Sequence, residues 1–149
     1  MIKEKVGSVK KVLVVDDDAN IRAVLEYRLK SENYGVRLAV DGLDALRQMS
    51  MDDFDLVILD LLLPEIDGLN VLQRIKSDPR TSDVPVIVLS ALSGSSYCDR
   101  ATTLGAERYI AKPVSLRRLV AEVRDLVGNG MSVAATPPYG IPVWEVNYR

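Results

Sequence analysis

Short runs of branched aliphatic residues alternate along the chain with stretches in which apolar residues recur every three or four positions. The aliphatic runs predict five strands, at residues 12–15, 36–40, 56–59, 86–89 and 108–111. The first, third and fourth runs are almost entirely apolar, which is typical of strands covered on both faces of a sheet. The stretches between and after them have the periodicity of amphipathic helices.

Polar residues mark where several of these helices begin. The expected N-caps are Asp18, Asp41, Asp67 and Ser115. Residues 128–130, Gly-Asn-Gly, end the last helix. Because strands and helices alternate with short connections, the sequence predicts an α/β fold. We expect a (βα)5 unit with a doubly wound, parallel five-stranded sheet.

Composition narrows the class of protein. Of the 149 residues, 48% are hydrophobic and 27% are charged, which suits one ordinary folded domain. The formal net charge of -2 offers no basic field to a polyanion, so we expect no direct DNA binding. The longest apolar run, residues 56–63, is far shorter than the ~20 residues of a membrane span, and the start of the chain lacks the apolar core of a secretory signal. With a single cysteine, Cys98, the chain fits a cytoplasmic protein without membrane insertion.

The sequence contains no histidine. This excludes catalysis by Ser-His-Asp or Cys-His groups and a phosphohistidine on this chain. The remaining chemistry must use carboxylates, lysine and hydroxyls, which follow the predicted strands at Asp16, Asp17, Asp60, Ser90 and Lys112. Because the carboxyl ends of parallel strands meet at one edge of a sheet, we expect these side chains to converge there.

Such a cluster predicts a phosphoaspartate site. Like charges at Asp16, Asp17 and Asp60 favour a hard divalent cation, and an open site of oxygen ligands points to Mg2+ rather than zinc. Lys112 and Ser90, with nearby backbone amides, suit the oxygens of a phosphoryl group. Each residue also has an ordinary explanation, because polar residues commonly end strands and cap helices. A carboxylate such as Asp60 after an apolar run is nevertheless costly to bury without a purpose.

Four motifs resemble, in order, those of the receiver domain of two-component response regulators. They span residues 12–18 (VLVVDDD), 55–68 (DLVILDLLLPEIDG), 85–91 (PVIVLSA) and 105–113 (GAERYIAKP). The resemblance covers about residues 10–127 and is to single-domain, chemotaxis-type receivers. It implies a flavodoxin-like sheet with strand order 2-1-3-4-5.

The resemblance assigns roles to the acidic residues. It implies that Asp60 is the phosphoacceptor, that Asp17, Asp60 and the carbonyl of Leu62 bind Mg2+, and that Asp16 acts mainly through water. Because this chain lacks histidine, the donor phosphohistidine must come from a sensor histidine kinase or a histidine phosphotransfer protein. Apart from transferring a phosphoryl group to itself and slowly hydrolysing it, we expect the chain to have no enzymatic activity.

The remaining roles concern the phosphoryl group and the response to it. The resemblance implies that Ser90, Ala91 and Lys112 hold the phosphoryl group, and that Ser90 and Tyr109 switch when it arrives. It also implies a cis peptide bond between Lys112 and Pro113. The fourth helix (residues 95–104), the fifth strand and the fifth helix would form the surface that contacts a downstream protein target.

Several residues depart from the common family pattern. Leu62 and Leu92 are apolar where polar side chains in relatives can position a hydrolytic water, so we expect a slowly decaying phosphoaspartate. Val114 replaces a frequent phenylalanine. A homodimer is compatible with the resemblance, but Arg108 and Arg118 stand where winged-helix regulators usually carry acidic residues at their dimer face.

The predicted domain organisation is a leader (residues 1–9), a receiver domain (10–127) and a tail (128–149). Because only 22 residues follow residue 127 in this sequence, we expect no DNA-binding or catalytic output domain. The alternation of the tail at Trp144, Val146 and Tyr148 predicts a strand with one buried face. Three interpretations stay open: the tail packs on its own receiver, it is the linker of a longer regulator of which this chain is a fragment, or it docks on a partner.

Other functions fit the residues less well. A haloacid dehalogenase type of phosphatase needs a second Asp two residues after its nucleophile, where this chain has Leu62. No Gly-rich phosphate loop follows a strand, which disfavours a nucleotide-binding enzyme. A phosphorylation-independent, receiver-like interaction module remains the alternative.

Overall fold

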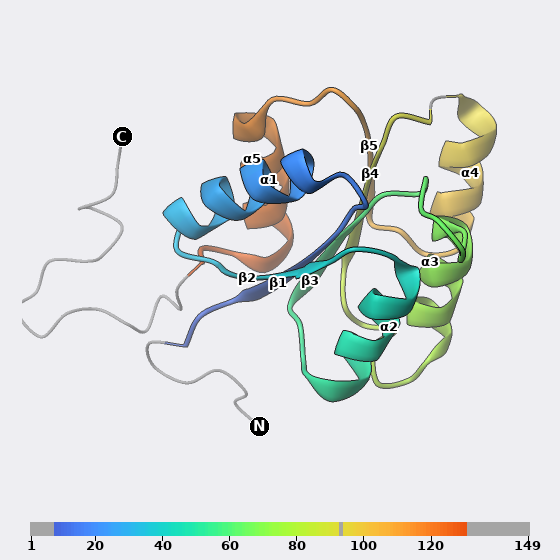
Figure 1. Ribbon diagram of the computed structural model, residues 1–149, viewed down its shortest axis with the longest axis horizontal. Helices are drawn as coiled ribbons and strands as arrows, with labels where there is room; N and C mark the ends of the chain where they lie inside the picture. Colours follow the sequence, from blue (N-terminus) through green and yellow to red (C-terminus); the bar gives the residue numbers. More distant parts are fainter. Residues whose placement is uncertain (1–7, 93, 131–149) are drawn as a thin grey trace, which may run out of the picture.

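The computed structural model describes residues 8–92 and 94–130, which form five strands and five helices in strict alternation (Figure 1). The strands are β1 (Lys11–Val15), β2 (Gly35–Ala39), β3 (Leu56–Leu59), β4 (Val86–Ser90) and β5 (Arg108–Ala111). The helices are α1 (Ala19–Ser31), α2 (Gly42–Met51), α3 (Gly68–Ser77), α4 (Ser95–Thr103) and α5 (Leu116–Val127). The strand predicted around Trp144 lies outside the described residues, as does most of the predicted leader.

The predicted helix starts are confirmed by hydrogen bonds. The carboxylate of Asp18 accepts from the N–H groups of Asn20 and Ile21. In the same way, side-chain oxygens cap the first turns of three further helices, at Asp41, Asp67 and Ser115. Each of these contacts satisfies an N–H group that the helix itself leaves unpaired. At the other end of α5, Gly128 is the C-cap, with φ +83°, a conformation that favours glycine.

The predicted boundaries of the second strand were wrong by one residue at each end. Pairing begins at Gly35, whose N–H donates to the carbonyl of Lys10 over 2.8 Å. It stops before Val40, because the Val40 N–H donates to the side chain of Asp44 instead of continuing in the sheet. A side chain of the following helix thus ends this strand.

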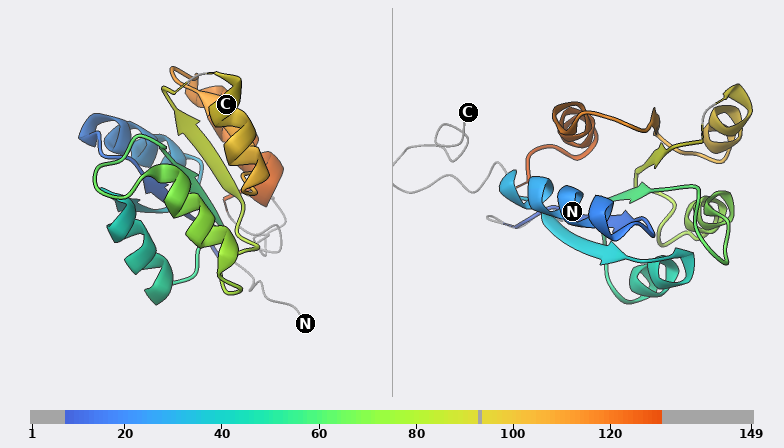
Figure 2. Two further views of the ribbon diagram at one scale, coloured as in Figure 1. Left: turned by 90° about the vertical axis from the view of Figure 1, so that its right-hand side faces the viewer. Right: turned by 45° about the horizontal axis from the view of Figure 1, so that its top comes forward.

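The sheet is parallel throughout and has the order β2-β1-β3-β4-β5, as the family resemblance implied. Helices α1 and α5 cover one face, whereas α2, α3 and α4 cover the other (Figures 1 and 2). Strand β1 shows why both faces are apolar: Leu13 and Val15 belong to one core cluster, and Val12 and Val14 belong to the other. Among the described residues, every helix falls short of the length and apolar character that crossing a bilayer requires.

The register of the central strands positions the polar residues that follow them. Val15 of β1 lies opposite Leu59 of β3, so the next residues, Asp16 and Asp60, emerge side by side. On the other side of β3, Ser90 at the end of β4 lies opposite Ala111 of β5. The topology therefore brings all the strand-end residues to the carboxyl edge of the sheet, at the point where the chain order reverses.

Candidate phosphoacceptor site

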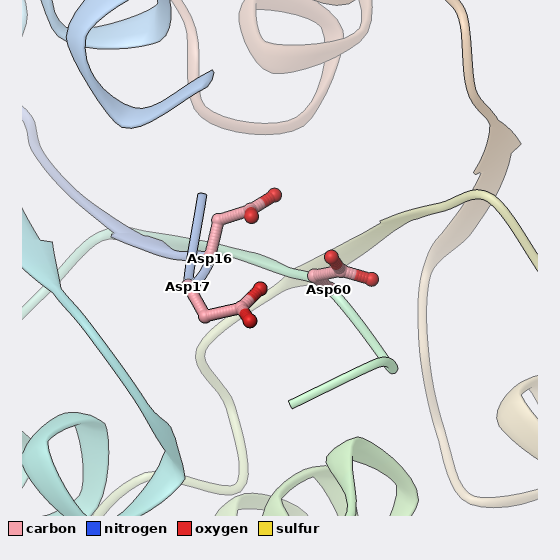
Figure 3. A group of neighbouring side chains, drawn as sticks. All are labelled: Asp16, Asp17 and Asp60. Atoms are coloured by element: carbon pink, nitrogen blue, oxygen red, sulfur yellow. The ribbon is translucent and has the colours of Figure 1, made fainter. Parts of the chain in front are cut away.

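Three carboxylates meet at the ends of β1 and β3 (Figure 3). Oxygen atoms of Asp16, Asp17 and Asp60 lie within 4.8 Å of one another. The sheet holds the backbone of this cluster, because the Asp60 N–H donates to the Val15 carbonyl over 3.0 Å. Asp16 and Asp60 are only 3% and 5% exposed, whereas Asp17 is exposed. The cluster is therefore a partly open group of oxygen ligands that could bind a metal ion.

Lys112 forms ion pairs with both buried carboxylates. Its Nζ donates to Asp16 Oδ2 over 2.8 Å and to Asp60 Oδ2 over 3.1 Å. Its backbone is tied to the neighbouring strand, because the Lys112 N–H donates to the Ser90 carbonyl over 2.9 Å. The peptide bond that follows, to Pro113, is cis. These contacts bring together residues that are 96 and 52 positions apart in the chain.

Burial and the hydrogen bonds between Lys112 and the carboxylates act in opposite directions in this cluster. Burial raises the pKa of Asp16 above its ordinary value, although the ammonium of Lys112 and the Asp18 N–H act in the opposite direction. Burial would also lower the pKa of Lys112, but the hydrogen bonds to Asp16 and Asp60 outweigh it, so this pKa is raised. Because folding raises the pKa of Asp16, the protonated form of this group favours the folded state at low pH. That contribution to stability is lost as the pH rises through the pKa that Asp16 has in the folded protein. Ionisation of Asp16 in the folded state therefore costs stability, and a bound cation would offset that cost.

The loop after β3 shapes the other side of Asp60. The Leu62 N–H donates to Asp60 Oδ1 over 3.0 Å, and the Gly68 N–H donates to the Leu61 carbonyl over 3.1 Å. A β-carbon at Gly68 would lie 2.7 Å from the Asp60 carbonyl oxygen and closer still to the Leu61 Cα. The sequence analysis used Asp67 as an N-cap and Gly68 as part of a motif, and it did not predict this contact. The Asp-Gly pair at a predicted helix start was the available signal.

The expected switch residues lie on the far side of the site, and both bind Leu92. Ser90 is fully buried, and its Oγ accepts from the Leu92 N–H over 3.2 Å. Tyr109 is half-buried and donates its hydroxyl to the Leu92 carbonyl over 2.6 Å. Burial raises the pKa of Tyr109, so the phenol keeps its proton at neutral pH. In the described part of the chain, neither hydroxyl is hydrogen-bonded to the carboxylate cluster, and Ala91 is exposed beside it.

The two arginines that depart from the family pattern are paired within the chain. Arg108 binds Glu122 over 2.8 Å and also binds Asp125, both on α5. Arg118 lies 4.0 Å from Glu122. The surface of β5 and α5 therefore holds an internal ion-pair network in place of free acidic groups.

Arg22 also supports the site and was not assigned a role from the sequence. Its guanidinium donates to the backbone carbonyl of Asp16 over 2.7 Å. It thereby joins the first turn of α1 to the end of β1, next to the carboxylate cluster. Its place directly after Ile21 in the first helix gave no signal that it would turn back to the strand end.

Lys112→Met is expected to lower the free energy of unfolding by about 3 kcal/mol in metal-free buffer, because it leaves two buried carboxylates without their cation. Added MgCl2 should stabilise this variant more than the wild type, since the ion no longer competes with an ammonium group. Urea unfolding with and without the salt measures both effects.

Lys30→Met is the control for this experiment. Lys30 forms an ion pair with Glu26 on the exposed surface of α1, so its loss should cost less than about 1 kcal/mol. Equal losses in the two variants would contradict the central role of Lys112 in the cluster.

Known proteins resemble this chain over the region just described. A family model, the response regulator receiver domain, matches residues 12–124. Among curated proteins, the probable transcriptional regulator ycf27 of Porphyridium aerugineum is 44% identical over 117 residues, which are 78% of this chain and 48% of that protein. The DNA-binding dual master transcriptional regulator RpaA of Synechocystis is 36% identical over 117 residues, with the same two coverages.

Solved structures match in fold as well. A CheY-like receiver domain protein of Methanospirillum hungatei is 26% identical, with a TM-score of 0.76 over 79% of this chain and 93% of that chain. The response regulator TrrA of Thermotoga maritima, in complex with Mg2+ and BeF, is 35% identical, with a TM-score of 0.71 over 78% of this chain and 98% of that one. This chain thus spans nearly all of these structures but about half the length of the curated relatives.

Proposed function

The chain belongs to the response regulator receiver family, and from this premise we propose that it accepts a phosphoryl group on Asp60 from a phosphohistidine. The donor is a sensor histidine kinase or a histidine phosphotransfer protein. The observation that carries the proposal is the placement of the Asp60 carboxylate, which lies at a strand end between two further carboxylates and the ammonium of Lys112.

The chain's own residues supply the parts of this transfer. A carboxylate oxygen of Asp60 forms the new bond to phosphorus while the bond from phosphorus to the donor's imidazole nitrogen breaks. Lys112 offers its positive charge to a phosphoryl oxygen, which would replace one of its present carboxylate partners. Ser90 Oγ and the N–H of Ala91 would bind a further oxygen, after Ser90 leaves Leu92. The sheet holds the backbone at these strand ends, so the reorganisation that the transfer needs is limited to Ser90 and Lys112 exchanging their hydrogen-bond partners.

We propose Mg2+ as the cofactor. Asp16, Asp17 and Asp60 offer oxygen atoms only, in a site that is open on the side of Asp17, and this donor set fits a hard cation that keeps some of its water. The carbonyl of Leu62 is a further ligand implied by the family. When bound, the ion would neutralise charge on the phosphoryl oxygens.

We also propose how the chain acts after phosphorylation. The phosphorylated receiver, in the cytoplasm, signals through the surface of α4, β5 and α5 to a downstream protein. Its own catalysis is limited to phosphoryl uptake and slow self-hydrolysis. The shared coverage with ycf27 and RpaA supports a second candidate, in which this receiver is one part of a longer regulator whose other part binds DNA.

The test is the intact mass of the chain after incubation with acetyl phosphate, with and without Mg2+. A gain of one phosphoryl group that depends on Mg2+ and on Asp60 is the expected result. No gain would favour the phosphorylation-independent interaction module.

The phosphorylated form is expected to decay over many minutes or longer. Leu62 is 50% exposed beside Asp60 and has no polar group with which to position a water molecule. Leu62→Asn should shorten the half-life by about tenfold, because orientation of the attacking water is what the amide would add. Loss of the phosphoryl group is followed by intact mass after removal of the donor.

Leu43→Asn serves as the matched control, since Leu43 is similarly exposed but lies on α2. Its half-life should equal that of the wild type. Decay of the wild-type phosphoprotein within seconds would contradict the expectation.

A further inference from the structure

Asp17 is the most open carboxylate of the cluster at the strand ends. The oxygen that it offers lies within 4.8 Å of those of Asp16 and Asp60 (Figure 3). Lys112 binds both of these neighbours, but among the described residues no hydrogen bond or ion pair reaches the Asp17 side chain. Because no described side chain holds this carboxylate, its placement depends on the backbone that carries it.

The two peptide groups on either side of Asp17 are each held by a hydrogen bond. On the N-terminal side, the carbonyl of Asp16 accepts from Arg22 Nη1 over 2.7 Å. On the C-terminal side, the N–H of Asp18 donates to Asp16 Oδ1 over 2.9 Å. Because each peptide group is planar, these two bonds fix the planes that meet at the Asp17 Cα. Together they determine the direction in which the Asp17 side chain leaves the main chain.

The start of α1 fixes Arg22 in turn. Asp18 caps the helix by accepting from the N–H groups of Asn20 and Ile21, and its carbonyl accepts from the Arg22 N–H over 3.0 Å. The half-buried Arg22 side chain then turns back to the strand end. Within the described part of the chain, its guanidinium forms no ion pair with a carboxylate. Arg22 therefore acts on the backbone of the cluster, through a hydrogen bond that its charge strengthens.

We propose that Arg22 is a positioning residue for Asp17. By holding the Asp16 carbonyl, it keeps the Asp17 carboxylate directed to the same point as those of Asp16 and Asp60. The inference rests on the proposed function, in which these three carboxylates hold Mg2+. Groups that orient metal ligands through hydrogen bonds change metal affinity by about 10–100-fold. Without the bond from Arg22, Asp17 would have to be ordered at the expense of binding.

The charge of Arg22 predicts the opposite effect on Mg2+ binding. A guanidinium near three carboxylates repels a cation that approaches them, so removal of its charge alone would strengthen the binding of Mg2+. Removal of a positioning bond weakens it. The sign of the change in affinity therefore separates the two roles.

The test is a calorimetric titration of the full chain with MgCl2, without a phosphodonor. Arg22→Met should raise the Kd for Mg2+ about tenfold. Arg22→Lys keeps a cation and a donor but lacks the planar fork, so its Kd should rise only about threefold. Arg28→Met is the charge-matched control, because Arg28 lies on the same helix and binds Glu32 over 3.1 Å. Its Kd should equal that of the wild type. Urea unfolding verifies that each variant is folded.

Phosphoryl uptake gives a second readout. With acetyl phosphate as donor, Arg22→Met should need about tenfold more Mg2+ for its half-maximal rate and reach the wild-type rate at saturating Mg2+. A residue that only stabilises the fold would leave both the Kd and this Mg2+ dependence unchanged in the folded variant.

The outcomes separate this inference from the proposed function. Weaker Mg2+ binding in Arg22→Met, partly recovered in Arg22→Lys and absent from Arg28→Met, supports the positioning role. Unchanged or tighter binding in a folded Arg22→Met protein overturns it, as does equal weakening in Arg28→Met. If Arg22→Met does not fold, Arg22→Lys decides, and an unchanged Kd in that variant overturns the role. A wild type that binds no Mg2+ overturns the proposed cofactor itself, and this inference with it.

Discussion

Asp60→Asn is expected to reduce phosphoryl uptake from acetyl phosphate to background. An acyl phosphate requires a carboxylate oxygen, and a carboxamide is a much poorer nucleophile. In the wild type, the Leu62 N–H donates to Asp60 Oδ1 over 3.0 Å. Asparagine has the same shape and keeps an oxygen that can accept this hydrogen bond. The free energy of unfolding should therefore change by less than about 1 kcal/mol. Intact mass and urea unfolding measure the two quantities.

Asp53→Asn is the control for this variant. Asp53 is exposed just before the start of β3, at the opposite end of this strand from the site, so its substitution should leave phosphoryl uptake unchanged. Equal uptake in the wild type and in Asp60→Asn would show that another residue is the acceptor. An unfolded Asp60→Asn protein would contradict the expected separation between chemistry and stability.

Gly68→Ala is expected to lower the free energy of unfolding by about 3 kcal/mol and to slow phosphoryl uptake. The added methyl group would overlap the backbone of Leu61 and lie 2.7 Å from the Asp60 carbonyl oxygen. Backbone atoms cannot move aside as a flexible side chain can, so α3 or the loop after β3 must shift. Because this loop supplies the N–H that binds Asp60, the damage should reach the site. Urea unfolding and the initial rate of mass gain test both effects.

Gly35→Ala separates this steric cost from the general effect of removing a glycine. A β-carbon at Gly35 has its nearest neighbours at 3.4 Å or beyond, in ordinary contact. That variant should change stability by less than about 1 kcal/mol. Equal destabilisation of the two variants would rule out the proposed overlap at Gly68.

Local signals in the sequence predicted much of the fold. Asp18, Asp41, Asp67 and Ser115 were identifiable because an N-cap depends on residues only two or three positions away. The five aliphatic runs marked the strands for the same reason. The order of the strands came from the family resemblance, because pairing between distant segments leaves no local pattern.

Details of the site were less predictable, since they depend on contacts across the chain. The sequence placed Lys112 at the site, but its simultaneous bonds to Asp16 and Asp60 depend on the register of four strands, β1, β3, β4 and β5. The predicted end of β2 was one residue too late, because the Val40 N–H donates to the side chain of Asp44 on the next helix. The tight approach of Gly68 to Leu61 is a packing property of a loop whose path no periodicity encodes.

The two hydrogen bonds on Leu92 make this residue a link between two equilibria, the displacement of Ser90 and the displacement of Tyr109. Its N–H is held by Ser90 and its carbonyl by Tyr109. Both bonds hold the backbone of the same residue, so a shift of Leu92 that releases one side chain also disturbs the bond to the other, and the two displacements are coupled. Such coupling is reciprocal. A target protein that holds Tyr109 in a new position would strengthen the capture of a phosphoryl oxygen by Ser90 to the same extent, so the downstream partner would help set how long the signal lasts.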